Sequence, residues 1–378
     1  MSFEELNLHP TLLAKLTSLG YKNPTPIQVQ AIPAILEGRD ILGIAKTGSG
    51  KTASFVLPIL NHLQTIAVGI RNRQPKVLVL VPTRELAVQV AEVFKELAIN
   101  LPRPVKSMAV YGGVSINPQM KGLNGVEVII ATPGRLLDLH RSSAIDFIKV
   151  DRLVIDEADK LLNMGFQEEM QEIISLVPRR RQNMLFSATL SDQLAGLNRV
   201  LLTKPVVIEI VNKRDEVELI NLLGYFVNEE RKGPLLRHLI LEKDMKQVLV
   251  FTSSVKEADK VASKLNKNGI HALSIHGKKS QSSRLEALGQ FKAGKVQVLV
   301  ATDLISRGID INELPYVINY ELPRSPKDFV HRVGRTGRAE TEGLAITFVT
   351  EEDKHHFKII LKKMKRVMDM VDSEALDF

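Results

Sequence analysis

The stretch Asp40-Ile-Leu-Gly-Ile-Ala-Lys-Thr-Gly-Ser-Gly-Lys-Thr52 joins a short apolar run to a glycine-rich loop. The run Asp40–Ile44 has the composition of a buried strand, and helix-like sequence follows Thr52. Glycines in such a loop let backbone N–H groups converge on phosphate oxygens, and the following helix adds its positive N-terminus. The stretch therefore predicts an α/β fold with a phosphate-binding loop between a strand and a helix.

Two side chains of this loop carry the chemistry of a nucleoside triphosphate site. Lys51 is placed to reach the β- and γ-phosphates, and the Thr52 hydroxyl is placed to bind Mg²⁺. The backbone around the phosphates comes from Thr47, Gly48, Ser49 and Gly50. Ala45 replaces the first glycine of the commonest version of the loop, and a small residue is tolerated there.

Apolar runs rich in β-branched residues alternate with helix-like segments along the whole chain. The predicted strands are Asp40–Ile44, Val77–Val81, Val105–Tyr111, Val126–Ala131, Arg152–Ile155 and Asn183–Phe186 in the first half, and Gln247–Phe251, Ala272–His276, Val296–Ala301, Tyr316–Tyr320 and Ala345–Val349 in the second. Nearly continuous apolar strands separated by helices indicate parallel sheets covered on both faces. Two such sets predict two doubly wound domains.

A polar, charged stretch separates the two sets of strands. We predict an N-terminal domain over residues 1–210, a linker over 211–218 and a C-terminal domain over 219–378. Further on, Glu351–Val371 has the pattern of a basic amphipathic helix. Packing of its apolar face on the second domain is favoured over a membrane-binding or RNA-binding arm.

Composition narrows the class of protein. The absence of cysteine excludes disulfides and thiolate metal sites and fits a reducing cytoplasm. We expect no signal peptide and no membrane span. The net charge of +8, divided equally between residues 1–210 and 211–378, weakly favours a polyanionic partner that contacts both halves. Aromatic residues make up 5% of the chain, too few for an extended base-stacking surface.

Polar clusters follow the predicted strands directly, and open α/β sheets bind ligands beyond the carboxyl ends of their strands. In Val154-Ile-Asp-Glu-Ala-Asp159, three acidic residues follow the carboxyl end of an apolar strand. Asp156 would hold Mg²⁺ through water, and Glu157 would orient and deprotonate the attacking water. An acidic helix N-cap is the alternative, which the neighbouring phosphate loop makes the weaker one. Because such clusters recur in both halves, we expect two sites that face one shared cleft.

The cluster His331-Arg-Val-Gly-Arg-Thr-Gly-Arg338 is the most informative in the second half. Arg335 and Arg338 are three residues apart, which predicts that they share one helical face. Planar guanidinium groups suit the charge of a γ-phosphate, so we expect both to act in phosphate chemistry. A solvated basic helix face is the alternative, but the interspersed glycines are unfavourable in a helix.

These motifs, in this order, resemble the DEAD-box RNA helicases over nearly the whole chain, in particular the bacterial kind without a tail. Gly20-Tyr-Lys-Asn-Pro-Thr-Pro-Ile-Gln28 resembles the adenine-reading motif, and Phe3 lies where the family places an upstream aromatic. The resemblance implies two tandem RecA-like domains and an ATP-dependent RNA helicase that closes its domains around ATP and RNA. ATP and Mg²⁺ are the implied cofactors, and single-stranded or partly duplex RNA is the implied partner.

The resemblance also assigns roles. Nucleotide contacts are assigned to Phe3, Tyr21, Gln28, Thr47, Gly48, Ser49, Gly50, Lys51, Thr52, Gly308 and Asp310, catalysis to Lys51, Glu157, Arg335 and Arg338, and Mg²⁺ to Thr52 and Asp156. RNA contacts are assigned to Pro82, Thr83, Arg84, Gly112, Gly113, Thr132, Gly134, Arg135, Arg284, Thr302 and Asp303, and coupling to Asp159, Ser187, Thr189 and His331. Hydroxyls, arginines and bare N–H groups contact phosphates and sugars, so binding should tolerate any sequence and weaken with salt.

Three positions depart from the family pattern. Lys46 stands where glutamine is usual, Ile305-Ser306 where two small residues are usual, and Ser254 where threonine is common, and none removes a catalytic group. The alternatives to an RNA helicase are a DNA helicase, a non-unwinding RNA clamp and a small-molecule P-loop kinase. The expected setting is the cytoplasm, with ribosomal RNA or ribonucleoprotein as a substrate, protein partners in RNA decay or ribosome assembly, and no membrane.

Overall fold

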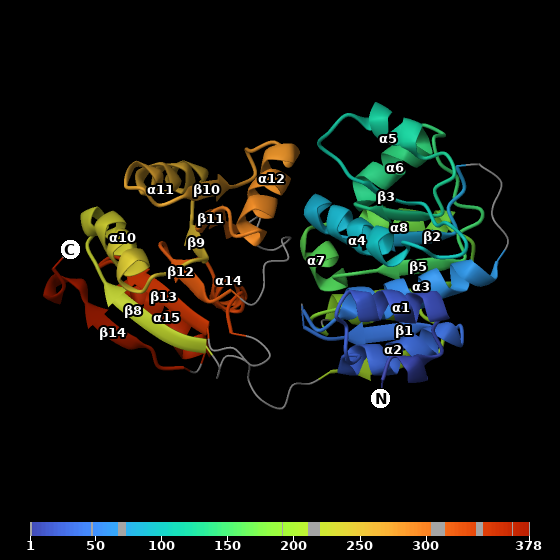
Figure 1. The fold of residues 1–378 in the computed structure, drawn as a ribbon, viewed down its shortest axis with the longest axis horizontal. Helices are drawn as coiled ribbons and strands as arrows, with labels where there is room; N and C mark the ends of the chain where they lie inside the picture. Colours follow the sequence, from blue (N-terminus) through green and yellow to red (C-terminus); the bar gives the residue numbers. More distant parts are fainter. Residues whose placement is uncertain are drawn as a thin grey trace. The chain divides into compact units, whose positions relative to one another are not determined.

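The structure is a computed structural model that describes residues 2–46, 48–66, 73–190, 192–210, 220–303, 314–337, 343–364 and 366–377. The predicted linker over 211–218 lies outside these residues. Contacts divide the chain into two compact units, Met1–Val211 and Asn212–Phe378, and each has its own sheet and its own core (Figure 1).

In the described part of unit 1, seven parallel strands form one sheet in the order β3-β4-β2-β5-β6-β1-β7. The strands are β1 (Ile41–Ile44), β2 (Val77–Leu80), β3 (Ser107–Val110), β4 (Val128–Ala131), β5 (Arg152–Ile155), β6 (Gln182–Ser187) and β7 (Val206–Glu209). The helices are η1 (Glu4–Leu6), α1 (Pro10–Ser18), α2 (Pro26–Leu36), α3 (Lys51–Thr65), α4 (Arg84–Leu97), α5 (Ile116–Gly122), α6 (Pro133–Arg141), α7 (Ala158–Asn163), α8 (Gln167–Leu176) and α9 (Asp192–Leu201).

Side chains of these strands alternate between two apolar cores, one on each face of the sheet. In β2, Val77 and Val79 pack with α1 to α4, whereas Leu78 and Leu80 pack with α6 to α9. A strand that is buried on both sides needs an apolar residue at every position. This explains the nearly continuous apolar runs, and the predicted parallel sheet with helices on both faces is confirmed.

Unit 2 repeats the architecture. Its described strands, all parallel, form a sheet in the order β10-β11-β9-β12-β13-β8-β14. They are β8 (Ile220–Phe226), β9 (Val248–Thr252), β10 (Ala272–Ile275), β11 (Val298–Thr302), β12 (Tyr316–Asn319), β13 (Gly343–Val349) and β14 (Asp369–Asp372). The helices are η3 (Glu229–Arg231), α10 (Lys232–Glu242), α11 (Val255–Lys267), α12 (Gln281–Lys292), α14 (Pro326–Val333), α15 (Lys354–Met364) and η4 (Ser373–Ala375).

The helix predicted over Glu351–Val371 is shorter in the structure than in the prediction. The structure has α15 only over Lys354–Met364, and β14 follows at Asp369–Asp372. The segment becomes a strand because it pairs in parallel with β8, whose edge would otherwise lack a partner on that side. The packing prediction is confirmed, since Phe357 and Ile360 of α15 are buried against α14.

A charged hydrogen-bond group ties α11 to β10 in unit 2. Ser274 Oγ donates to Asp259 Oδ1 at 2.5 Å, and His276 Nε2 lies 3.0 Å from the same oxygen. Burial acts to raise the pKa of Asp259, but the hydrogen bonds from Ser274 and His276 outweigh it and hold the pKa at about 2. The ionised carboxylate therefore stabilises the folded unit.

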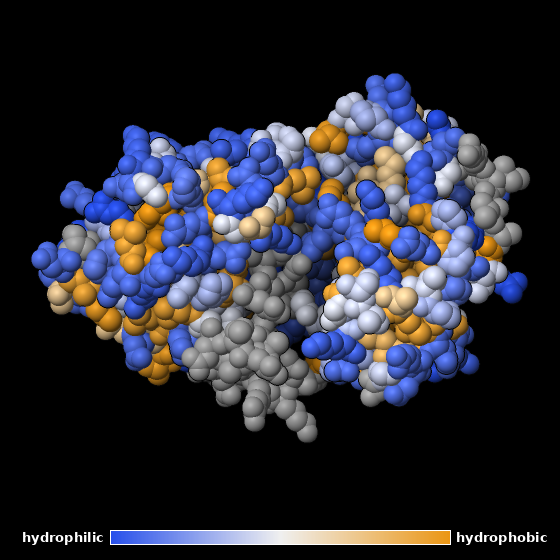
Figure 2. Space-filling view, in the orientation of Figure 1, coloured by the Kyte–Doolittle hydropathy of each residue, from blue (hydrophilic) through white to orange (hydrophobic). Residues whose placement is uncertain are grey.

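One outer face of each unit is mainly polar. The face drawn in Figure 2 is mostly hydrophilic on both units, with apolar side chains in small patches. Within the described residues, the structure contains no helix with both the length and the apolarity that crossing a bilayer requires.

Candidate nucleotide and RNA site

The strand order of unit 1 sorts its polar clusters into two groups. The phosphate loop, the carboxylate cluster and the Ser187–Thr189 segment follow β1, β5 and β6, which are neighbours in the sheet. The clusters predicted to contact RNA follow β2, β3 and β4, which are also neighbours. Because all strands are parallel, both groups lie at the same edge of the sheet, with the nucleotide group beside the RNA group.

The phosphate loop is fixed by the N-terminus of α2. Gln28 is buried, its Oε1 accepts from the Thr25 N–H at 2.9 Å, and its Nε2 donates to the Gly50 carbonyl at 3.2 Å. Gly50 has φ +92°, and a Cβ there would lie 2.6 Å from Gln28 Nε2. The last glycine of the loop is therefore required both by its backbone conformation and by the close approach of Gln28.

Lys51 and Asp156 face each other across the nucleotide region, and both are buried. Lys51 is 6% exposed and donates to the Ala45 carbonyl at 2.5 Å. Burial lowers the pKa of Lys51, against the opposing effect of Asp156 and Glu157. Burial likewise raises the pKa of Asp156 to about 6, although Lys51 acts in the opposite direction. The two charges stabilise each other, since both side chains are buried.

Glu157 is held in an unusual backbone conformation. It has φ +51° and ψ +46°, in the left-handed region that residues other than glycine seldom adopt, and it is the N-cap of α7. Its Oε1 pairs with Lys160 Nζ at 2.7 Å. Its Oε2 is buried and, among the described residues, has no hydrogen-bond partner. One carboxylate oxygen of Glu157 is therefore buried and unpaired within the described part of the chain.

The residues present fit a Mg²⁺ ion. The described residues contain no group of three acidic or histidine side chains that could hold a metal by themselves. Mg²⁺ in triphosphate sites, however, takes most of its ligands from phosphate and water and needs only one or two from the protein. Asp156 is a buried carboxylate whose pKa is raised, so an added cation would stabilise its ionised form. Thr52, half-buried in the first turn of α3, supplies a hydroxyl.

The segment after β6 is linked to the carboxylate cluster. Thr189 Oγ1 donates to Asp159 Oδ2 at 3.1 Å, and Ser187 Oγ donates to the Thr189 carbonyl at 2.8 Å. Asp159 lies in the first turn of α7, directly after Glu157 and Ala158. These bonds connect the start of α7 with the segment that leads into α9, so three of the four residues predicted to act in coupling lie together.

Two aromatic residues predicted to contact the base also lie together. The rings of Phe3 and Tyr21 meet edge to face with centroids 6.5 Å apart. Phe3 is 5% exposed and belongs to the core, whereas Tyr21 is 45% exposed. Tyr21 therefore offers the accessible ring, and Phe3 supports it from behind.

In the RNA group, Arg84 lies over the backbone of Gly113. A Cβ at Gly113 would lie 2.1 Å from Arg84 Nη2, and Gly113 has φ +76°. Gln119 fixes the loop that carries this glycine, because its side-chain amide accepts from the Tyr111 N–H at 3.0 Å and donates to the Tyr111 carbonyl at 3.1 Å. A bare glycine thus lets a guanidinium and a backbone N–H lie side by side, as phosphate binding requires.

The remaining predicted RNA contacts of unit 1 surround this pair. Thr83 is the N-cap of α4, and its Oγ1 accepts from the Leu86 N–H at 3.3 Å. Arg135 of α6 is 8% exposed and donates to the Val114 carbonyl at 2.8 Å, so it holds the glycine loop. Thr132 and Pro82 are buried at the ends of their strands, and Gly134 is half-buried. Arg135 therefore stabilises the glycine loop, and little of its side chain is exposed to contact RNA.

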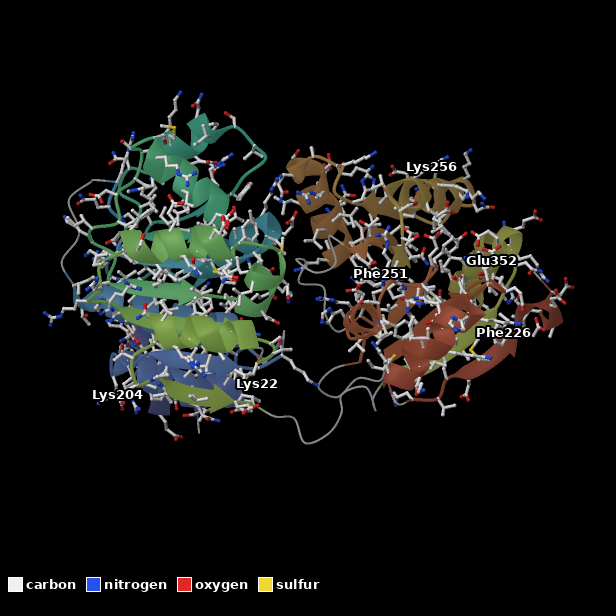
Figure 3. The ribbon with its side chains drawn as sticks, turned by 180° about the vertical axis from the view of Figure 1, so that it is seen from behind. Lys22, Lys204, Phe226, Phe251, Lys256 and Glu352 are labelled. Carbon is white, nitrogen blue, oxygen red and sulfur yellow. The ribbon has the colours of Figure 1, made fainter. Side chains whose placement is uncertain are left out.

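Unit 2 contains a buried arginine that the site assignments left out. Arg332 of α14 is 1% exposed, and its Nε and Nη2 donate to the two carboxylate oxygens of Asp303 at 2.6 and 2.8 Å. Its Nη1 donates to the Glu321 carbonyl at 2.6 Å, and its guanidinium lies 5.0 Å from the ring centroid of Phe251, labelled in Figure 3. Asp303, predicted to contact RNA, is thus engaged by Arg332 and fixes the end of β11 to α14.

Arg335 does not lie on a helical face as predicted. The helix α14 ends at Val333 with Gly334 as its C-cap, and Arg335 follows in a turn at 7% exposure. The turn is held by a bridge between Leu314 and Thr336, because the Arg335 carbonyl accepts from the Leu314 N–H at 3.0 Å. Glycine ends the helix before the three-residue spacing can operate.

Three other residues of unit 2 with a predicted role lie in the described part of the chain. Arg284 lies in the first turn of α12 and donates to Gln281 Oε1, Thr302 is 8% exposed at the end of β11, and His331 is exposed on α14. Thr47, Gly308, Asp310 and Arg338 lie outside the described residues, as do Ile305 and Ser306.

Comparison with known proteins decides the family. Residues 25–197 match the DEAD/DEAH box helicase family model, and residues 231–340 match the helicase conserved C-terminal domain. The chain is 38% identical over 379 residues to DEAD-box ATP-dependent RNA helicase CshA of Bacillus cereus, an alignment that covers 100% of this chain and 70% of that protein. This chain belongs to the DEAD-box helicase family.

Other DEAD-box relatives agree. ATP-dependent rRNA helicase rrp3 of Emericella nidulans is 41% identical over 354 residues, which are 93% of this chain and 75% of that protein. The structure of S. cerevisiae Dbp5 bound to RNA and ADP BeF3 matches with a TM-score of 0.83 and 29% identity, and the match covers 99% of this chain and 96% of that chain. The predicted fold of two tandem RecA-like domains is confirmed.

Two residues that position the DEAD-box motifs carried no assignment from the sequence. Arg332 stood inside a quoted motif, and its position three residues after the apolar Phe329, on the same face of a helix, was the available sign that it points inward. Gln119 had no such sign, because a glutamine between turn residues is compatible with any exposed loop. Both act through hydrogen bonds to residues far away in the sequence, which spacing does not reveal.

Proposed function

We propose that this chain is an ATP-driven helicase that grips one RNA strand by its backbone and separates short duplexes. The observation that carries the proposal is the buried oxygen Glu157 Oε2, which lacks a hydrogen-bond partner in the described part of the chain and belongs to the same cluster as Lys51 and Asp156. A buried carboxylate oxygen left unpaired costs stability, so its position is best explained by a substrate group that it meets.

In this proposal, unit 1 binds the triphosphate and prepares the attacking water. Lys51 contacts the β- and γ-phosphates, and the N–H groups of the glycine loop bind their oxygens. Glu157 Oε2 accepts a proton from water as the water oxygen attacks the γ-phosphorus, and the bond to the β-phosphate oxygen breaks to leave ADP. A bound Mg²⁺, held by Asp156 and the Thr52 hydroxyl, would neutralise charge on the β- and γ-phosphates.

RNA recognition in this proposal depends on phosphates and sugars. Arg84 with the Gly113 backbone, and the hydroxyls of Thr83 and Thr132, offer donors to phosphate oxygens. These groups carry no readout of base identity, so the chain should bind RNA of any sequence, and binding should weaken as salt rises. Arg284 and Thr302 add contacts of the same kind from unit 2.

Coupling requires both units, because the proposed catalytic groups are divided between them. Lys51 and Glu157 belong to unit 1, and Arg335 and Arg338 to unit 2. We propose that ATP and RNA each bind to both units, so that each favours the same closed state and raises the affinity for the other. An arginine brought to the γ-phosphate contributes about 10³- to 10⁵-fold in rate. Loss of the γ-phosphate removes this link, and the units then separate.

A cellular setting and a class of natural substrate can also be proposed. We propose action in the cytoplasm on structured RNA such as ribosomal RNA or ribonucleoprotein, with protein partners in RNA decay or ribosome assembly. This rests on the family and on the curated relatives, among them a helicase named for rRNA.

The test compares nucleic acids as activators of ATP hydrolysis by the full chain. We expect single-stranded RNA to raise the ATPase rate, single-stranded DNA of the same sequence to have little effect, and ATP to drive displacement of a strand from a short RNA duplex. Equal stimulation by DNA would indicate a DNA helicase, and stimulation without displacement would indicate an RNA clamp. An ATPase rate that RNA leaves unchanged would contradict the coupling.

A further inference from the structure

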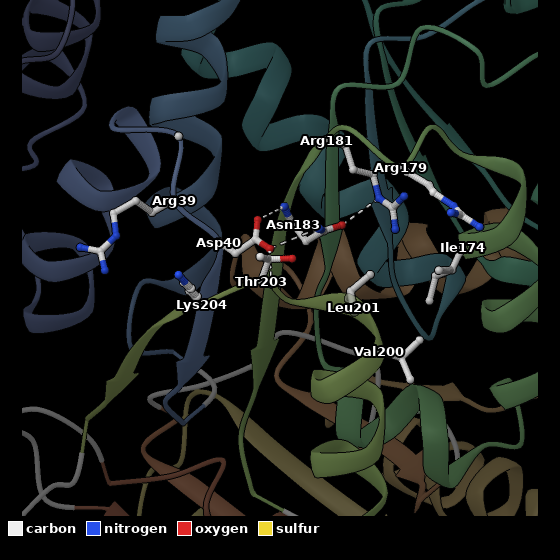
Figure 4. A pocket seen from close by; sticks show the side chains of 11 residues that line it. Arg39, Asp40, Ile174, Arg179, Arg181, Asn183, Val200, Leu201, Thr203 and Lys204 are labelled. Carbon is white, nitrogen blue, oxygen red and sulfur yellow. Dashed lines mark hydrogen bonds between the residues drawn. The ribbon is translucent and has the colours of Figure 1, made fainter.

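Unit 1 has a basic hollow at the edge of its sheet opposite to the phosphate loop. It lies where β1 and β6 begin, between the residue before β1, the end of α8 and the turn after α9, and has a volume of about 890 Å³ (Figure 4). Arg39, Arg179 and Lys204 are exposed on it, and Arg181 is half-buried. Because β1 separates it from the nucleotide loop, this hollow is distinct from the nucleotide site.

The positive charge of the hollow is only partly neutralised by the residues that the structure describes. Asp40 is the one carboxylate among its described lining residues, and it accepts from the backbone N–H groups of Asn183 at 2.7 Å and Thr203 at 2.8 Å. Within the residues that the structure describes, no carboxylate forms an ion pair with Arg39, Arg179 or Lys204. Two guanidinium groups and one ammonium group without a carboxylate partner among the described residues would attract an acidic ligand to this concave surface.

An apolar groove adjoins the hollow. It has a volume of about 550 Å³ and lies between α7, α8 and α9, with lining residues that include Leu162, Met170 and Leu197. Ile174 and Val200 line both the groove and the hollow, so the two form one continuous surface, and Figure 4 shows their side chains beside Arg179. Val200 is 78% exposed, although its side chain is wholly apolar.

The combination of an aliphatic groove with a basic rim identifies the kind of ligand. RNA would use the cations, but it would gain little from the groove, because none of the described residues that line either surface is an aromatic on which a base could stack. A groove between helices lined by aliphatic side chains is suited to the apolar anchors of an amphipathic helix. Cations beside such a groove add steering and specificity for acidic residues flanking the anchors.

We propose that the surface formed by this hollow and groove is a docking site for an acidic amphipathic peptide segment of a partner protein. Its apolar anchors would enter the groove over Gly196, and its acidic side chains would lie on Arg39, Arg179 and Lys204. The site does not depend on the proposed ATP and RNA chemistry.

Gly196 gives a way to block the groove while keeping the fold. It lies within α9 on the wall of the groove, and a Cβ there would meet nothing within 4 Å. Gly196→Leu therefore fills the groove with an apolar side chain and replaces a poor helix former with a good one. Gly289→Leu in α12 of unit 2 is the matched control, because a Cβ there also meets nothing within 4 Å.

The probe is a displayed library of random peptides about 16 residues long, enough for roughly four helical turns. Peptides are selected on the full chain, and their affinities for the variants are measured by fluorescence anisotropy. We expect selected peptides to carry apolar residues at helical spacing with Asp or Glu between them. Gly196→Leu should weaken them at least about tenfold and Gly289→Leu should leave them unchanged. Arg179→Glu should weaken them severalfold at low salt, and Lys256→Glu on α11 should not.

Three results would overturn the proposal. Selected peptides that bind Gly196→Leu as tightly as the unchanged chain would show that the groove is not their site. Loss of single-stranded RNA affinity in Arg179→Glu, with no acidic peptide selected, would assign the surface to RNA. A concentration-dependent dimer that Gly196→Leu abolishes would assign it to a second copy of this chain.

Discussion

Gly113→Ala should weaken RNA binding while leaving the ATP site intact. In the structure, a Cβ at position 113 would lie 2.1 Å from Arg84 Nη2 and 2.3 Å from Arg84 Cζ. The guanidinium must therefore leave its place over the glycine, at the end of a flexible side chain that can move at little cost to the fold. What is lost is the position from which Arg84 is proposed to contact an RNA phosphate.

The expected size of the effect follows from that contact. A hydrogen bond to a charged group contributes about 1.5–3 kcal/mol, which corresponds to about 10- to 100-fold in RNA affinity. The positive φ of +76° at Gly113 adds a folding cost of about 1–2 kcal/mol for alanine. Gly125→Ala is the control, because Gly125 has a similar φ of +72° and so a similar strain, whereas a Cβ there meets nothing within 4 Å.

The assay is fluorescence anisotropy of a labelled single-stranded RNA with a non-hydrolysable ATP analogue present. Affinity for a fluorescent ATP analogue and stability to denaturant are measured on the same samples. We expect Gly113→Ala to lose RNA affinity with normal nucleotide affinity, and Gly125→Ala to keep both affinities at a similar small cost in stability. Equal RNA affinities for the two variants would refute the placement of Arg84 at the RNA backbone.

Three further predictions concern single positions. Gly50→Ala should reduce ATP affinity about tenfold or more in equilibrium binding, because it strains φ +92° and places a Cβ 2.6 Å from Gln28 Nε2; unchanged affinity would contradict the assigned loop geometry. Arg332→Ala should destabilise unit 2 by about 3 kcal/mol in denaturant unfolding, because it leaves the Asp303 carboxylate without its bidentate partner; a loss below about 0.5 kcal/mol would count against that pair. Asp259→Asn should cost under about 1 kcal/mol near neutral pH, since the side chain is 49% exposed. As the folded pKa of about 2 lies below the ordinary 3.8, this difference should disappear as pH falls from 4 to 2, and a constant difference would be inconsistent with it.

The sequence predicted most of the strands that carry the chemistry because they are buried on both faces. Arg152–Ile155 was predicted with its observed bounds, and the predicted Val77–Val81 differs from β2 by one residue. The strand β8 was not predicted, because Ile220–Phe226 mixes Asn and Gly into its apolar run and lies near the edge of its sheet. β14 was read as the end of a helix, since pairing with β8 is a long-range effect that local pattern does not contain.

For the site, residue type and spacing predicted the chemistry better than the geometry. Lys51, Asp156 and Glu157 lie together as their motifs implied, because they follow β1 and β5, two parallel strands on either side of β6. The left-handed backbone of Glu157 and its pairing with Lys160 were not predictable, since glutamate has no preference for that conformation. The helical face expected for Arg335 was wrong because Gly334 ends the helix, and the role of Asp303 as the partner of Arg332 depends on contacts across 29 residues.

The most direct measurement is ATP hydrolysis by Glu157→Gln with saturating RNA. Glutamine keeps the shape of the side chain but accepts no proton at Oε2, so we expect the turnover rate to fall about 10²- to 10⁴-fold. ATP affinity should stay near that of the unchanged chain, and the variant should hold ATP and RNA together in a long-lived complex. Turnover at the normal rate would contradict the assignment of Glu157 as the base and, with it, the proposed hydrolysis centre.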